Sequence, residues 1–353
     1  PCRQVAVTLA KLVGDPYASN DSLFCSSPRV GTKKMNVLVI GSDGFLGKSI
    51  AESLWARGAQ VFGMTRSGSL GIHERHHVNA DRNDGDSIEE IVREKDIEVV
   101  VDLLAYDRCN TATVIEQLQK QCRYVLVSSI DVYRQYGWFQ KLETGFSGND
   151  LIRRDSPLRT SRYPYRDSQL RDPATKDAWM DNYEKIKVEA LVREGCLSWT
   201  IVRLPMIYGP GDKQNRFDWA LRPALSDEGI VEFPIEWLDW TSTYCFVENA
   251  GSFIAEVCGD ASTSGQILVS VDHPAMSQSE WLALFAIACD WHGRVKGSSN
   301  RSLPLAQRTK GLDLKVHLKF DVPRELVRTG IKPVIDLQTA VRLTVEDAKR
   351  RLA

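Results

Sequence analysis

The 353-residue sequence lacks the features that would direct it to a membrane or to nucleic acid. Its longest apolar runs, such as residues 37–40, have the length of a strand and fall far short of the roughly 20 residues that span a bilayer. The 45 Lys and Arg residues balance 46 Asp and Glu residues, so no overall charge attracts an anionic surface. We therefore expect a small-molecule substrate as the partner, with no nucleic acid and no membrane.

Cysteine and histidine are present, but not in the patterns of a disulfide scaffold or a zinc site. The eight cysteines form no C-x-x-C pair, and His76 and His77 are the one adjacent pair among six histidines. We therefore expect no metal and a reducing, cytoplasmic compartment. Residues 1–34 precede Met35 and contain few acids, so they could be an organellar targeting segment or an extension that carries no chemistry.

From Met35 onward, short β-rich apolar runs alternate with helical stretches. We expect strands near residues 36–40, 60–64, 98–104, 124–128 and 199–204, with helices near 44–57, 87–94, 111–120 and 181–194. Leu46, Ile50 and Leu54 place one apolar stripe on the first of these helices. This order predicts an α/β fold, a Rossmann-type doubly wound parallel sheet, over residues 35–205.

After residue 205 the alternation becomes less regular. We expect helices near 247–258, 278–289 and 337–351 and a strand near 266–271, so residues 206–353 should form a smaller C-terminal α/β lobe that binds the substrate. An insert at 138–180 contains six arginines and several aromatic residues. It could be a lid whose arginines bind a phosphate or carboxylate, or simply a solvated face.

A glycine-rich turn joins the first strand to the first helix. Gly41 would allow the tight turn, Gly44 would let the backbone approach a pyrophosphate, and Gly47 would let helix and strand pack closely. Phe45 and Leu46 lie between the last two glycines, at the positive end of the helix. The context of strand, turn and helix predicts a dinucleotide site.

The end of the second strand indicates which dinucleotide is preferred. Sites that prefer NAD usually have an acidic residue there, whereas this sequence has Thr65 and Arg66. A guanidinium can pair with a 2′-phosphate, so we expect NADP, with NAD remaining possible.

Several further motifs occur in the order and spacing of a known family. The sequence resembles the extended short-chain dehydrogenase/reductases, the NAD-dependent epimerase/dehydratase family, in the glycine turn and in segments 81–82, 102–105, 128–133, 183–187 and 203–212. The resemblance implies that Asp81 and Arg82 contact the adenine, that Leu104 and Ala105 lie along the cofactor, and that Pro205 meets the nicotinamide. It also implies a homodimer formed through the helices near 111–120 and 181–194.

The resemblance implies a catalytic set of Ser129, Tyr183 and Lys187. A Tyr-x-x-x-Lys spacing on a helix would place the phenol and the ammonium one turn apart, so that the positive charge lowers the pKa of Tyr183. Lys187 would also bind the nicotinamide ribose, and Ser129 would donate a hydrogen bond to the reacting oxygen.

Two markers of the family are missing. Nucleotide-sugar dehydratases have a Thr-Asp-Glu triplet where this sequence has Ser129, Ile130 and Asp131. The arginine by which many epimerases hold a diphosphate is absent from residues 237–242. The sequence therefore does not indicate a nucleotide-sugar substrate.

These observations predict an NAD(P)-dependent oxidoreductase or epimerase that acts on a hydroxyl or ketone of a small sugar-like or specialised-metabolite substrate. The sequence does not choose between epimerase, reductase and dehydratase. The alternative is a non-catalytic Rossmann protein that senses a dinucleotide or binds RNA, a class that tends to lose the Tyr-Lys pair.

Overall fold

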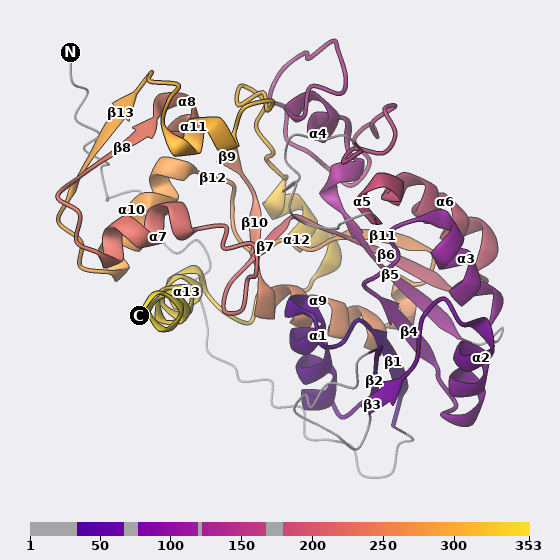
Figure 1. The fold of residues 1–353 in the computed structure, drawn as a ribbon. Helices are drawn as coiled ribbons and strands as arrows, with labels where there is room; N and C mark the ends of the chain where they lie inside the picture. The colour runs from indigo at the N-terminus through magenta and orange to yellow at the C-terminus, as the bar shows by residue number, and fades with distance from the viewer. Residues whose placement is uncertain (1–33, 67–76, 119–121, 167–178) are drawn as a thin grey trace.

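A computed structural model describes residues 34–66, 77–118, 122–166 and 179–353 (Figure 1). The described chain forms two lobes, a large α/β lobe and a smaller lobe built around short strands and helices.

A seven-stranded parallel sheet is the centre of the larger lobe. Its strand order is β11-β6-β5-β4-β1-β2-β3, formed by β1 (Asn36–Ile40), β2 (Gln60–Thr65), β3 (His77–Asn79), β4 (Val99–Asp102), β5 (Arg123–Ser129), β6 (Trp199–Leu204) and β11 (Gln266–Val269). The strand order reverses between β1 and β4, as it does in a doubly wound sheet. The fold class expected from the sequence is therefore confirmed.

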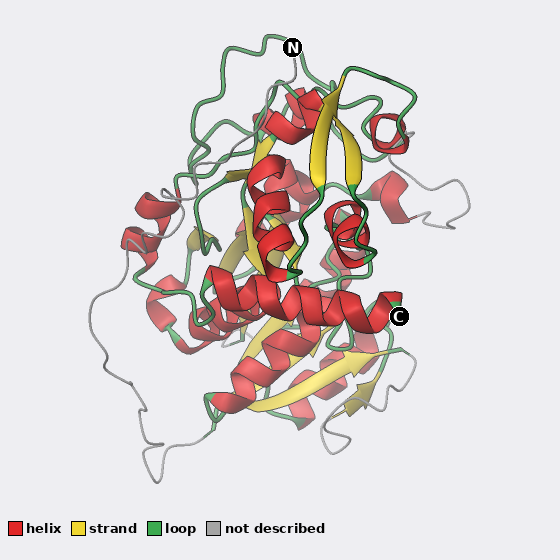
Figure 2. Ribbon diagram, turned by 90° about the vertical axis from the view of Figure 1, so that its left-hand side faces the viewer, coloured by secondary structure: helices red, strands yellow, loops and turns green. Residues whose placement is uncertain are grey.

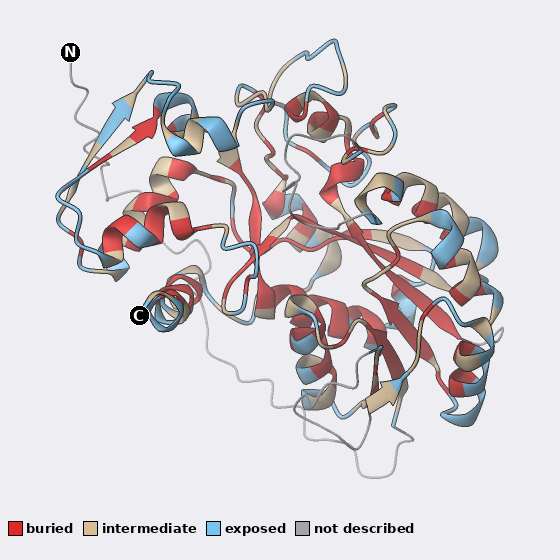
Figure 3. Cartoon of the chain, in the orientation of Figure 1, coloured by how far each residue is buried: buried red, intermediate tan, exposed pale blue. Residues whose placement is uncertain are grey.

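Helices cover both faces of the sheet (Figure 1). Val37 and Val39 of β1 pack on one face with α1 (Phe45–Ala56) and α9 (Val247–Gly259). Leu38 and Ile40 point to the other face, where they meet α2 (Gly85–Glu94), α3 (Arg108–Glu116) and α6 (Lys185–Gly195). Strands buried on both faces are mostly apolar, which is why the central strands contain runs such as residues 37–40 and 99–101 (Figure 3).

The smaller lobe has an aromatic core. Trp281, Phe285, Tyr208 and Phe217 are buried together there. Its elements are β7 (Met206–Tyr208), α7 (Asp218–Leu225), β8 (Ile230–Pro234), α8 (Ile235–Asp239), β9 (Thr241–Ser242), β10 (Tyr244–Phe246), β12 (Met276–Ser277), α10 (Gln278–Ala288), β13 (Arg294–Ser298), α11 (Pro304–Arg308) and α13 (Leu337–Leu352). α12 (Val322–Thr329) packs instead with β11 and the residues that follow β5. Figure 2 shows α13, which ends near the C-terminus, crossing the molecule as one long helix.

Residues after 205 do not stay in the smaller lobe. The chain returns to the large lobe, where α9 covers one face of the sheet and β11 pairs in parallel with β6. The two lobes are therefore not separated by a single boundary at residue 205, because α9 and β11 follow that residue and belong to the large lobe.

The expected helix over 181–194 is interrupted in the structure. α5 (Trp179–Asn182) ends before Tyr183, and α6 begins at Lys185. The physical reason is a cap: the Glu184 side chain accepts a hydrogen bond from the Ile186 N–H, which starts a new helix at that point. Tyr183 therefore lies outside the helix, contrary to the expectation. Of the expected helix over 111–120, residues 119 and 120 lie outside the described residues.

α1 and α9 cross at a very short distance. The Ser49 hydroxyl donates to the Val247 carbonyl over 3.0 Å, and a Cβ added at Gly251 would lie 2.7 Å from the Ser49 carbonyl carbon. The crossing therefore depends on the missing side chain at Gly251.

We expect Gly251→Ala to destabilise the protein by about 1–3 kcal/mol, because the methyl group would overpack this crossing. Gly259→Ala, at the end of the same helix, should cause no loss, since nothing lies within 4 Å of its added Cβ. Urea unfolding of both variants tests the prediction. Equal unfolding midpoints would contradict it.

Candidate functional site

The glycine-rich turn has the geometry expected of a diphosphate cradle. Gly41 has a φ of +90°, which favours glycine. A Cβ at Gly47 would collide with the Gly41 carbonyl oxygen, so helix and turn can approach only through glycine. Gly44 is the N-cap of α1, and no side chain caps this helix end. The first N–H groups of α1, around Phe45 and Leu46, therefore suit an anionic group.

The strand ends beside this turn carry the other expected cofactor residues. Leu104 lies against the turn, 3.1 Å from the position of a Cβ at Gly41. Ala105 is buried just after β4, Arg66 is exposed just after β2, and Pro205 directly follows β6. These positions are compatible with a dinucleotide laid across the carboxyl ends of the strands.

Arg82 is held by the protein itself. Its Nη2 donates over 2.6 Å to Asp102, which also accepts from the Tyr124 hydroxyl at 2.6 Å and from the Leu104 N–H at 2.8 Å. The guanidinium therefore ties the end of β4 to the segment after β3. Asp81, next to it, is only partly buried. The adenine contact expected of both residues stays a prediction.

Ser129 and Tyr183 meet at a buried carboxylate. Ser129 ends β5 and its hydroxyl accepts the Asp131 N–H at 3.2 Å. The Tyr183 hydroxyl donates to Asp131 Oδ2 at 2.7 Å, and the Tyr165 hydroxyl donates to the same oxygen at 3.1 Å. Burial and the Asp131 carboxylate raise the pKa of Tyr183 well above its usual value. The sequence had predicted the opposite direction.

The expected contact between Tyr183 and Lys187 is not formed. Lys187 Nζ donates instead to the Tyr163 hydroxyl at 2.6 Å and lies 4.6 Å from the centre of that ring. Because α6 begins after Tyr183, four residues of spacing do not bring the two side chains together on one helical face. The expectation that Lys187 lowers the pKa of Tyr183 is therefore wrong. The catalytic role of Lys187 stays a prediction.

Lys185 contacts the ends of two central strands. It is buried, and its Nζ donates to the carbonyl oxygens of Ala105 at 2.9 Å and Val127 at 2.8 Å, at the ends of β4 and β5. Burial lowers the pKa of Lys185 to about 8. Sequence analysis did not assign this residue. Glu189, one helical turn after Lys185, pairs with Arg203 at 2.7 Å.

Three arginines of the insert contact other parts of the protein, and one of them, Arg159, is buried. Arg159 is buried, and its two terminal nitrogens donate hydrogen bonds of 3.0 and 3.1 Å to the Glu184 carboxylate. Its Nε donates to the Asp131 carbonyl at 2.6 Å. Arg153 pairs with Asp321 at 3.0 Å, and Arg166 donates to the Asp181 carbonyl and stacks on Tyr163. These three arginines support the protein's own structure. Arg171 lies outside the described residues.

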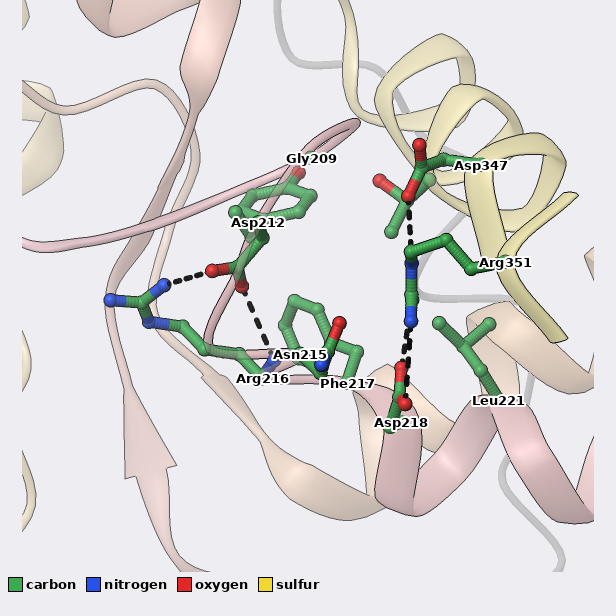
Figure 4. Close-up of a pocket in the computed structure, with 11 residues that line it drawn as sticks. Gly209, Asp212, Asn215, Arg216, Phe217, Asp218, Leu221, Asp347 and Arg351 are labelled. Atoms are coloured by element: carbon green, nitrogen blue, oxygen red, sulfur yellow. Dashed lines mark hydrogen bonds and ion pairs between the residues drawn. The ribbon is translucent and has the colours of Figure 1, made fainter. Parts of the chain in front are cut away.

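A small pocket lies apart from these residues, between α7 and α13 (Figure 4). Arg351 extends between Asp218 and Asp347, with hydrogen bonds of 2.8 and 3.0 Å. Arg216 donates to Asp212 at 2.6 Å. The pair of Arg351 and Asp218 joins the two helices, whereas the other two pairs lie within α13 and within the segment before α7.

In the part of the chain that the structure describes, no group of three or more His, Cys, Asp and Glu side chains could hold a metal ion. None of the described helices has the length and apolar character needed to span a membrane.

Comparison with known families gives one match. Residues 37–127 match the NAD dependent epimerase/dehydratase family, which confirms the resemblance seen in the sequence. This family is named for two enzyme activities, so the expectation of an enzyme is confirmed at the level of the family. No curated protein matches the sequence.

Solved structures match over most of the chain. UDP-glucose 4-epimerase from Thermus thermophilus, in complex with NAD, has a TM-score of 0.61 at 19% identity and covers 89% of this chain and 99% of its own. UDP-glucose 4-epimerase from Thermotoga maritima, with UDP-glucose, has a TM-score of 0.62 at 16% identity, with coverage of 90% and 100%. dTDP-glucose 4,6-dehydratase from Bacillus anthracis, in complex with NAD, has a TM-score of 0.63 at 15% identity, with coverage of 90% and 97%. At these identities the likeness establishes the fold.

The buried pair of Arg159 and Glu184 yields a stability prediction. Arg159→Met should destabilise the protein by about 3–5 kcal/mol, because it leaves a buried carboxylate unpaired. Arg153→Met is the matched control: its guanidinium is half exposed, and the loss should stay below about 1 kcal/mol. Urea unfolding measures both. A small effect at Arg159 would mean that Glu184 finds another partner.

Proposed function

We propose that this chain, whose residues 37–127 match the NAD dependent epimerase/dehydratase family, is an NAD(P)-dependent oxidoreductase or epimerase. Its substrate would be small and sugar-like or a specialised metabolite, and the reacting group a hydroxyl or ketone. The observation that carries the proposal is the convergence of Ser129, Tyr183 and Lys185 near the carboxyl ends of β4 and β5.

The placement of these groups beside the glycine turn supports a redox reaction. In a doubly wound sheet, ligands bind beyond the carboxyl ends of the strands, where the strand order reverses. That reversal lies here between β1 and β4, and both Gly41 and Ala105 lie at it. A dinucleotide held at this turn would supply or accept a hydride.

Each protein group has a role in the proposed reaction. Ser129 would donate a hydrogen bond to the reacting oxygen, and Tyr183 would give or take its proton. Lys185, whose ammonium lies between two strand ends, is better placed than Lys187 to meet a nicotinamide ribose. A single hydride transfer with release of the cofactor would give a reductase, and re-reduction of a bound ketone would give an epimerase.

The catalytic assignment is tested by three variants. Tyr183→Phe should abolish turnover, about 100- to 10,000-fold, while leaving NADPH binding nearly intact. Lys185→Met should weaken NADPH binding about 10- to 100-fold, the loss of one charge-assisted hydrogen bond. Lys187→Met should weaken it much less. NADPH fluorescence titration and reduced-cofactor absorbance measure these effects.

The reverse order of the two lysine variants would return the ribose role to Lys187, as its sequence spacing predicted. Cofactor binding with no turnover on any hydroxyl or ketone substrate would favour the non-catalytic, dinucleotide-sensing alternative.

We propose NADP as the preferred cofactor, because the exposed Arg66 follows β2 where an acid would repel a 2′-phosphate. Arg66→Ala should weaken NADPH binding about tenfold or more and leave NADH binding unchanged. Arg93→Ala, an exposed arginine in α2, is the control. Equal affinities for both cofactors in the unaltered protein would remove Arg66 from the argument.

We also propose a homodimer formed through α3 and α6, which pack side by side on one face of the sheet. Two-fold dimers are the commonest protein assemblies. Light scattering at micromolar concentration should give twice the 39.7 kDa mass of the chain. A monomeric mass would contradict this arrangement.

A further inference from the structure

Asp131 lies at the centre of a buried group of hydroxyls. Its side chain is only 1% exposed. One carboxylate oxygen, Oδ2, accepts from Tyr183 at 2.7 Å and from Tyr165 at 3.1 Å. The hydroxyl oxygens of Tyr136 and Tyr165 are 3.0 Å apart, so these two phenols share a hydrogen bond. The other carboxylate oxygen, Oδ1, is buried and has no hydrogen-bond partner among the described residues.

Charged and titratable groups face Asp131 from every neighbouring element. Arg159 of the insert and Lys185 of α6 favour the carboxylate, as does the hydrogen bond from Tyr183. The phenols of Tyr136 and Tyr165 also adjoin the carboxylate. Arg159 forks onto Glu184 and reaches Asp131 only at its backbone carbonyl. Burial outweighs these effects, and the pKa of Asp131 is raised above its usual value.

We propose that Asp131 accepts the proton that Tyr183 releases, so that Tyr183 relays a proton between substrate and carboxylate without becoming a phenolate. This proposal rests on the proposed function, because it assigns a second proton carrier to the same site. The contact that carries it is the 2.7 Å hydrogen bond from the Tyr183 hydroxyl to the buried Asp131 Oδ2.

The step balances in both directions. When a substrate alcohol is oxidised, its O–H bond breaks and its proton passes to the Tyr183 oxygen. The Tyr183 O–H bond breaks at the same time, and that proton passes to Asp131 Oδ2. The hydride from the substrate carbon goes to the oxidised nicotinamide dinucleotide. The products are a ketone, the reduced dinucleotide and a neutral Asp131 carboxylic acid, and reduction of a ketone reverses each transfer.

A phenolate mechanism needs a cation beside the phenol, and in the described part of the chain neither Lys185 nor Lys187 is hydrogen-bonded to the Tyr183 hydroxyl. Lys187 is hydrogen-bonded to Tyr163. Lys185 Nζ is bound to two carbonyl oxygens and lies 5.9 Å from the centre of the Tyr183 ring. A carboxylate as the direct partner of the phenol opposes its ionisation but favours proton transfer through it.

The first test needs no substrate. Infrared spectra of the cofactor-free protein are recorded across a pH titration, and the spectra of Asp131→Asn are subtracted to isolate the Asp131 carboxylic acid band. The band should persist to a higher pH than that of an ordinary aspartic acid. Tyr183→Phe should shift its midpoint higher still, because the phenol's hydrogen bond favours the carboxylate.

Tyr208→Phe is the matched control, since Tyr208 is a buried tyrosine whose hydroxyl has no hydrogen-bond partner in the part of the chain that the structure describes. It should leave the midpoint unchanged. The relay would be overturned if the Asp131 band disappeared in the pH range of an ordinary aspartic acid, or if its midpoint were unchanged in Tyr183→Phe.

The second test uses turnover, with UDP-glucose and cyclohexanol as alcohol probes and NADP⁺ and NAD⁺ as oxidants. Asp131→Asn should lower kcat about 100- to 10,000-fold with unchanged dinucleotide Kd, and the acidic limb of the pH profile should disappear. Wild-type turnover and an unchanged profile in Asp131→Asn would overturn the relay. Failure of the unaltered protein to bind either dinucleotide would instead count against the proposed function, and the infrared titration would still decide whether Asp131 and Tyr183 share a proton.

Discussion

The arrangement of the site depends on the buried carboxylate of Glu184. It accepts the fork of Arg159, the Tyr163 N–H at 2.6 Å and the Ile186 N–H at 3.2 Å. A buried carboxylate is tolerated only when its oxygens are bonded in this way. By capping α6, Glu184 decides that Tyr183 stays outside the helix and that Lys185 begins it. The insert is thereby joined to the start of α6 through Arg159 and Glu184. Arg159 also contacts the segment after β5, where Asp131 binds the Tyr183 hydroxyl.

The backbone of the large lobe was predictable from the sequence because its physics is local and repetitive. β1 and β6 were expected with their observed bounds, since strands buried on both faces are rich in apolar residues. The glycine turn was predictable because its geometry requires glycine at two positions: Gly41 has a positive φ, and a Cβ at Gly47 would collide with the Gly41 carbonyl oxygen. β11 was expected as a strand, but its place beside β6 depends on a long-range pairing that no local pattern encodes.

The side-chain partners were harder to predict. The spacing of Tyr183 and Lys187 suggested a contact only if one helix contained both, and a cap between them removed that condition. The sequence indicated only that residues 129–131, which include Asp131, differ from the Thr-Asp-Glu triplet of nucleotide-sugar dehydratases. It did not indicate a role for Asp131. Its proximity to Tyr183 and Tyr165 requires the insert to fold back over the end of β5, which involves contacts such as Arg159 to Asp131. The insert's arginines likewise looked available to a ligand because their acidic partners lie far along the chain, as Asp321 does from Arg153.

The close crossing of α1 and α9 has a consequence for how the chain must be assembled. The hydrogen bond between Ser49 and Val247 spans 198 residues, so the helix that follows the glycine turn gains its cover only after most of the chain is available. Until then, one apolar face of the sheet is open to solvent, and non-local contacts of this kind slow folding. A nascent or truncated chain that ends before residue 247 would thus carry the glycine turn on an uncovered, aggregation-prone sheet.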